Sequence, residues 1–188
     1  MIDVSFWSVE RAAGFLLIVG SVAAFAGLMM FTLRGGHRGG APPSHAHWVW
    51  ERSFIMAAVV LTALGFVLLE GSFQNTNGQV LANIGATAYL FGGVLLVTAE
   101  ALSLTLGYEK LYGLIVIYVI TAFLAQAAIG GAFLQAGSLA VWIAWAIILW
   151  NIAWLVVLAV ISRRDMYFPV LHHFMPLIIG IALLLSAA

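Results

Sequence analysis

The sequence predicts an all-α integral membrane protein, a bundle of six transmembrane helices in which consecutive helices are antiparallel neighbours. Of its 188 residues, 64% are hydrophobic and only 7% are charged, and the mean hydropathy is +1.13. Water-soluble domains carry about 25% charged residues, so lipid must be the solvent for most of this chain. The chain also contains six apolar runs of near-spanning length, and none shows the alternation typical of a barrel strand.

Charged and turn-forming residues divide the chain into these runs. The first lies between Arg11 and Arg34, the second follows Arg52, and the third is interrupted only by Glu100. The connecting segments are rich in glycine, asparagine or proline and, apart from the first (residues 35–47), they are short. We therefore expect a single transmembrane domain over residues 1–188. Its expected spans cover residues 12–33, 53–70, 80–106, 111–135, 139–161 and 167–187.

The basic residues predict an orientation. Six of the seven lie in or beside the first, third and fifth loops: Arg34, Arg38, Arg52, Lys110, Arg163 and Arg164. Only Arg11 lies at the opposite side. Because basic residues are concentrated in cytoplasmic loops, both termini are expected on the non-cytoplasmic side of the membrane.

The composition also limits the partners and the chemistry. The chain has no cysteine, which excludes disulfides, thiolate metal sites and cysteine nucleophiles. Its net charge is zero, so nothing indicates a nucleic-acid partner. Small residues at helical spacing in the first and third spans favour close helix packing. The expected partners are membrane lipids, other membrane subunits or further copies of this chain.

Glu100 is the charged residue that lies well inside an expected span, roughly 10 Å from its end at 1.5 Å per residue. A carboxylate there costs about 2.5–3.5 kcal/mol on insertion scales, so we expect it to face the bundle interior and to have a partner. At a functional site, Glu100 can stay neutral by protonation, pair with Arg163 or Arg164, or bind a cation. At a structural site, its partner is a serine, threonine or tyrosine hydroxyl on a neighbouring helix. Arg163 and Arg164 are themselves interpreted as a cytoplasmic stop signal, with an anionic-lipid site as the alternative.

All five histidines fall on the expected cytoplasmic side. His172 and His173 begin the sixth span, and Pro176 frees the His172 carbonyl because proline has no N–H to donate to it. We interpret both as interfacial side chains. The alternative is that one of them is a haem or metal ligand or carries a proton. His45 and His47 form an HxH motif in the first loop, which together with the later pair would suit zinc or non-haem iron. A solvated loop is the simpler interpretation, and haem is disfavoured because no second span offers a histidine at matching depth.

Two further pairs of polar residues are interpreted as structural. Arg11 and Glu70 lie at the non-cytoplasmic ends of the first two spans, where they are expected to pair. Gln126 and Asn151 lie near the middle of the fourth and fifth spans and are expected to hydrogen-bond across helices. Lining of a transport path is the alternative for these two amides.

Three functional hypotheses follow. The first is a non-catalytic accessory subunit or a bundle that binds a lipophilic ligand. The second is a membrane redox or metal-dependent enzyme with a His/Glu site at the cytoplasmic face, built on Glu100 with His172 or His173. The third is a small transporter lined by Glu100, Gln126 and Asn151. The absence of a catalytic signature favours the first, and the sequence indicates neither an enzymatic activity nor a particular metal, haem or quinone.

Overall fold

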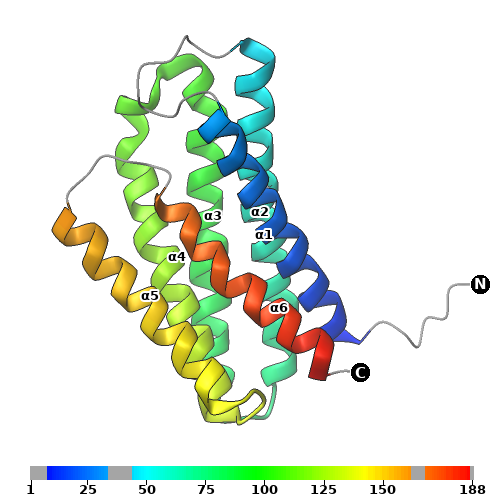
Figure 1. The fold of residues 1–188 in the computed structure, drawn as a ribbon. Helices are drawn as coiled ribbons and strands as arrows, with labels where there is room; N and C mark the ends of the chain where they lie inside the picture. The colour runs from blue at the N-terminus through cyan, green and yellow to red at the C-terminus, as the bar shows by residue number, and fades with distance from the viewer. Residues whose placement is uncertain (1–7, 34–43, 162–167, 187–188) are drawn as a thin grey trace, which may run out of the picture.

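The computed structural model of the protein describes residues 8–33, 44–161 and 168–186, and these are almost entirely helical (Figure 1). They form six α-helices and two short 3₁₀ helices, which confirms the expected all-α class. In chain order the elements are α1 (Val9–Leu33), α2 (His45–Glu70), η2 (Gly71–Phe73), α3 (Gln79–Leu106), α4 (Tyr108–Ala136), α5 (Val141–Ile161), η3 (Phe168–His173) and α6 (Phe174–Ser186).

The first five helices pack in sequence order, each antiparallel to the one before it (Figure 1). α6 packs along α1 rather than along its predecessor α5. The sequence of helix contacts therefore runs α5, α4, α3, α2, α1, α6, and the start of α6 also meets α5, where the rings of Phe174 and Trp150 stack with centroids 5.7 Å apart. The described start of α1 and the described end of α6 lie at the same end of the bundle (Figure 1). The side of the membrane on which that end lies stays a prediction.

Five of the six described α-helices, α1 to α5, are long and apolar enough to cross a membrane. The sixth differs from the expected span over residues 167–187. Its α-helix begins only at Phe174 and has 13 residues, about 20 Å at 1.5 Å per residue. Pro176 explains this start, since its ring clashes with the His172 carbonyl in a longer α-helix but fits the first turn of a helix. The residues before it form η3 instead.

α2 also differs from the expected span, because it begins at His45 instead of near residue 53. Ser44 caps this start, and its side chain accepts a hydrogen bond from the His47 backbone N–H at 3.2 Å. Both HxH histidines therefore belong to the first turn of a helix rather than to a loop. The same shift places Glu51 and Arg52 inside α2, about two turns from its start.

Glycines allow the helices to approach closely. A Cβ added at Gly20 in α1 would lie 2.7 Å from the Thr62 hydroxyl oxygen of α2, and one at Gly180 in α6 would lie 2.6 Å from an α1 carbonyl. Gly85 in α3 meets the α4 backbone in the same way, at 2.8 Å. The packing role expected for small residues in the first and third spans is confirmed, and Gly130 extends it to the contact between α4 and α5.

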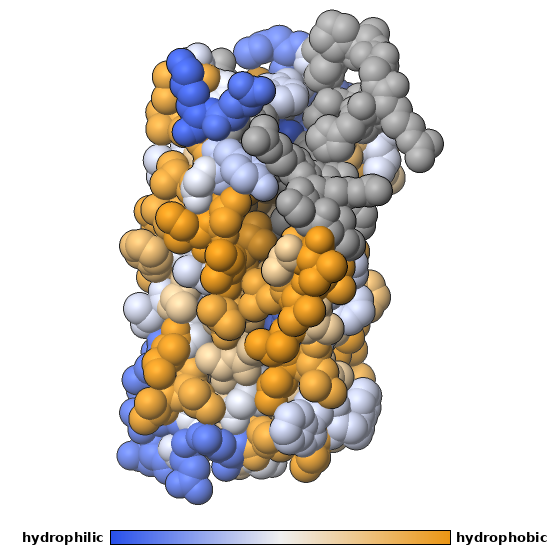
Figure 2. Space-filling view, turned by 90° about the vertical axis from the view of Figure 1, so that its left-hand side faces the viewer, coloured by the Kyte–Doolittle hydropathy of each residue, from blue (hydrophilic) through white to orange (hydrophobic). Residues whose placement is uncertain are grey.

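The outer surface is apolar over most of its height. Figure 2 shows a band of hydrophobic side chains on one face, with hydrophilic side chains gathered towards the two ends. Large exposed hydrophobic side chains occur on every α-helix, among them Val22, Val60, Phe91, Leu124, Leu149 and Ile181. An apolar band of this kind matches the hydrocarbon layer of a bilayer.

Candidate functional site

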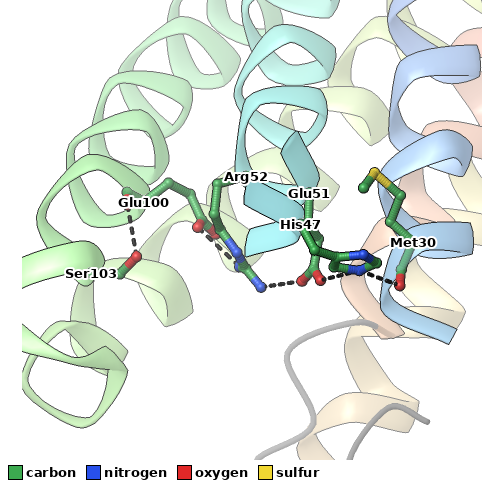
Figure 3. A network of polar contacts seen from close by, with 6 residues as sticks. All are labelled: Met30, His47, Glu51, Arg52, Glu100 and Ser103. Atoms are coloured by element: carbon green, nitrogen blue, oxygen red, sulfur yellow. Dashed lines mark hydrogen bonds and ion pairs between the residues drawn. The ribbon is translucent and has the colours of Figure 1, made fainter. Parts of the chain in front are cut away.

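A buried cluster of charged residues joins α2 to α3. Arg52 donates from Nη1 to the Glu100 carboxylate at 3.0 Å and from Nη2 to the carboxylate of Glu51 (Figure 3). All three residues are at most 4% exposed. Glu100 thus faces the bundle interior with a charged partner, as expected, but its described partner is Arg52. The alternatives Arg163 and Arg164 lie outside the described residues.

The cluster continues to α1 through His47 (Figure 3). Its Nε2 lies 3.0 Å from the Met30 carbonyl oxygen and 3.9 Å from a Glu51 carboxylate oxygen, one helical turn further along α2. On the other side, the Ser103 hydroxyl donates to the Glu100 carbonyl at 2.7 Å, within α3. Polar contacts therefore connect three helices at the end of the bundle where α2 begins.

A second polar group surrounds the two histidines of η3. The His172 Nε2 lies 3.0 Å from the Tyr89 hydroxyl of α3 and 2.9 Å from the Tyr118 hydroxyl of α4. The His173 Nδ1 lies 3.4 Å from the Thr62 hydroxyl of α2. An imidazole nitrogen accepts one hydrogen bond or donates one. The two tyrosine hydroxyls therefore share the His172 Nε2, and the three side chains form one polar network.

Both histidines are only 2% exposed, so the interpretation of them as interfacial side chains is wrong. That interpretation assumed a sixth α-helix running from one membrane surface to the other. Instead η3 contacts both α1 and α4 and is enclosed by them. Tyr118 lies ten residues into α4, about 15 Å from its start, so its partner His172 lies well inside the bundle.

Side chains from two helices satisfy the backbone of η3. The Ser21 hydroxyl of α1 is shared between the His173 carbonyl at 2.9 Å and the Leu17 carbonyl of its own helix at 2.8 Å, and the Trp150 indole of α5 donates to the Leu171 carbonyl at 3.3 Å. Backbone groups that lie outside regular helix and away from water need such partners. These bonds fix the position of η3 and hence the direction of both imidazoles.

A cavity joins the charged cluster to the histidines. Arg52 and Glu100 line it together with Tyr118, His172 and His173, and aliphatic side chains complete the walls. Its volume is about 40 Å³. A bound water needs about 10–15 Å³, so the cavity has room for roughly three waters. It is too small for a quinone, a carotenoid or a sterol.

The two amides expected to bond across helices do not do so. Gln126 is fully buried, and neither polar atom of its side chain has a hydrogen-bond partner. The Asn151 amide nitrogen donates at 2.7 Å to the carbonyl of Ile147 in its own helix, and its side-chain oxygen has no partner. The bond of Asn151 lies within its own helix and uses one of the two N–H donors of the amide.

At the opposite end of the bundle, two carboxylates contact neighbouring segments. The Ser72 hydroxyl donates to Glu10 at 2.8 Å. The amide of Asn83 lies against Glu70, and its nitrogen donates at 2.6 Å in the orientation that satisfies both groups. Arg11 lies at the start of α1, where its backbone N–H donates to the Ser8 hydroxyl. The ion pair between Arg11 and Glu70 stays a prediction.

The metal site of four histidines, the alternative interpretation of His45, His47, His172 and His173, is not assembled in the described residues. Within the described ranges, no three histidine, aspartate or glutamate side chains are grouped so that they could hold a metal ion. His45 is exposed at the start of α2, and His47 contacts Met30 there. His172 and His173 lie deeper, against tyrosine and threonine hydroxyls.

The sequence did not single out several residues of this site. Arg52 was treated as the boundary of the second span, although an arginine can lie inside a helix when it pairs with a carboxylate such as that of Glu51. Tyr89 and Tyr118 carry a usable signal, since mid-span tyrosines lie outside the interfacial belts where this residue is common. Thr62 carries none that separates it from other threonines.

Comparisons with protein-family models, with curated proteins and with solved structures find no match to this chain. A function must therefore be argued from the charged cluster, the histidine pair and the cavity that joins them.

Proposed function

We propose that this protein is an integral membrane protein that relays protons along a buried path between α1, α2, α3, α4 and η3. The observation that carries the proposal is the shared cavity, which is lined by Glu100 together with Tyr118, His172 and His173. Carboxyl, imidazole and phenol groups can each hold and release a proton. Water in a cavity of this size can bridge between them.

The surroundings support this reading. Five helices can span a membrane, and the site lies between them rather than on the lipid-facing surface. Ionisable residues inside membrane segments are costly, and chains of carboxylates and histidines there are characteristic of proton relays. The Arg52 guanidinium has donors and no acceptor, so its role is to hold the carboxylate of Glu100 in place.

The path begins at the bundle end where α2 starts. His47 is 28% exposed there and contacts Glu51. The carboxylates of Glu51 and Glu100 both accept hydrogen bonds from Arg52, so the path continues from one carboxylate to the other without passing through the guanidinium. Further along, the path reaches Tyr89, which packs edge-on against Phe66 with ring centroids 5.1 Å apart. Phe73 and Phe133 pair in the same way further towards the other end. The polar groups thus reach about the middle of the bundle and then meet aromatic packing, so we expect slow passage rather than an open pore.

The test is proton entry into lipid vesicles that contain the purified protein. A potassium diffusion potential drives protons inwards, and a trapped pH-sensitive dye reports their arrival. We expect acidification to be faster than in empty vesicles, and Glu100→Gln to slow it roughly a hundredfold, as for loss of a proton-transferring group. Tyr118→Phe, which removes a single hydroxyl, gives a second and milder block.

The matched control is Glu109→Gln, because Glu109 is an exposed carboxylate in the first turn of α4. This variant is expected to acidify like the wild type. Equal rates in protein-containing and empty vesicles would exclude the relay, and so would equal rates for Glu100→Gln and Glu109→Gln.

A bundle that binds a lipophilic ligand is the second candidate, and one observation favours it. A hollow of about 540 Å³, lined mainly by apolar side chains that include Trp142 and Ile181, lies between α5 and α6. Mass spectrometry of compounds extracted from the purified protein tests this function. A stoichiometric lipophilic compound that is lost in Ala182→Trp, which fills the hollow, would support it. Val156→Trp, on an exposed position of α5, is the control, and loss of the compound in both variants would contradict it.

A further inference from the structure

Two buried amides at the contact between α4 and α5 have polar atoms without partners. They are Gln126 and Asn151, both 0% exposed. Three of their atoms make no hydrogen bond: Nε2 and Oε1 of Gln126 and Oδ1 of Asn151. Buried polar groups in native proteins are almost always hydrogen-bonded, to protein or to ordered water. Three unsatisfied atoms at one contact therefore need an explanation.

The register of the two helices places these amides at the same level. Gly130 of α4 faces α5, since an added Cβ there would lie 3.0 Å from the Ile147 side chain and 3.1 Å from the Ala144 carbonyl. The helices are antiparallel, so one turn back along α4 corresponds to one turn forward along α5. That step leads from Gly130 to Gln126 and from Ile147 to Asn151.

We propose that Gln126 and Asn151 form a buried binding site for ordered water between α4 and α5. The unsatisfied atoms comprise one donor group and two acceptors. Water matches this set, because it can donate to both oxygens and accept from the amide nitrogen. Buried waters in proteins typically make about three such bonds to groups that otherwise lack partners.

This site is separate from the cavity beside Glu100. Gln126 lies eight residues beyond Tyr118 along α4, about 12 Å further from the end where α2 begins. Asn151 donates to Ile147 within α5, and neither amide lines that cavity. Water binding here does not depend on the proposed proton relay, and the two are tested by different measurements.

The test is radiolytic labelling of the protein in lipid nanodiscs. Brief irradiation converts bound water to hydroxyl radicals, which oxidise adjacent side chains, and mass spectrometry locates the products. Ile147 and Ile179 form a matched pair, because both are 0% exposed isoleucines and only Ile147 adjoins the two amides. We expect label on Ile147 and none on Ile179.

The variants Gln126→Leu and Asn151→Leu remove the amides while keeping side chains of similar size. Each is expected to abolish the label on Ile147, and either variant suffices should the other fail to fold. An unlabelled Ile147 in the wild type would overturn the proposal, as would a label that persists in both variants.

Discussion

Replacement of Arg52 by methionine tests whether the charged cluster holds α2 to α3. Methionine keeps an unbranched apolar side chain of similar length but removes the guanidinium. The wild-type residue donates to carboxylates on both sides, at 3.0 Å to Glu100 and also to Glu51, and it is 3% exposed. Arg52→Met therefore removes a buried cation while both carboxylates remain.

The expected loss follows from this burial. Exposed ion pairs contribute about 0–1 kcal/mol, because water screens them. Removal of one partner from a buried pair costs about 3–5 kcal/mol, because the remaining charge has lost its compensation. With all three members at most 4% exposed, we expect the larger figure for Arg52→Met. Arg52→Lys keeps the charge but loses the planar fork, so its cost should be smaller.

The assay is reversible unfolding in mixed micelles, followed by tryptophan fluorescence as the fraction of denaturing detergent rises. A double-mutant cycle with Glu100→Gln isolates the pair. Because the two side chains touch, we expect a coupling free energy of about 0.5–3 kcal/mol between Arg52→Met and Glu100→Gln. The same cycle with Glu109→Gln should give no coupling.

Two results would refute this reasoning. A loss below about 1 kcal/mol for Arg52→Met would mean that the pair behaves as if solvated. A coupling free energy with Glu100→Gln no larger than that with Glu109→Gln would mean that the observed contact contributes nothing specific.

Three further predictions use the same unfolding assay. Tyr118→Phe removes one of two hydroxyls at the His172 imidazole and should lower the free energy of unfolding by about 1 kcal/mol, the usual net value of a hydrogen bond. An unchanged free energy of unfolding would mean that the bond is not formed. Gln126→Leu should cost about 1 kcal/mol or more if the proposed water bonds to the amide, and a gain in stability would show that the amide is unsatisfied. Gly180→Val forces side-chain atoms against the α1 backbone and should cost about 1–3 kcal/mol. Gly113→Val is the control, because Gly113 has open space around it. Equal costs for the two variants would contradict the close approach of α1 and α6.

The sequence was sufficient for the helical class and for the burial of Glu100, because both follow from the cost of polar groups in lipid. It was not sufficient for the partner of Glu100. Arg52 was taken as the boundary of the second span, since a lone arginine marks a membrane edge. An arginine that meets two carboxylates can instead lie inside a helix, and only tertiary packing brings Glu100 to it across 48 positions of sequence.

The tyrosine and histidine network shows a second limit of sequence analysis. Pro176 indicated a local break but not its extent. The structure shows that the break ends the α-helix altogether and turns the preceding residues into η3. The contact of His172 with Tyr89 and Tyr118 then depends on three segments far apart in sequence. No local pattern encodes a contact of that kind.

The short sixth helix and the buried site share one cause. A continuous α-helix in the place of η3 would pair its own backbone groups and would need no help from its neighbours. Because η3 breaks that pattern, Ser21 and Trp150 supply hydrogen bonds to its carbonyls from two other helices. The same bonds hold η3 inside the bundle, and they bring His172 and His173 to the wall of the cavity that Glu100 also lines. In a transmembrane bundle, irregular backbone is tolerated only where protein or a water-filled cavity surrounds it, and such positions commonly carry the functional groups.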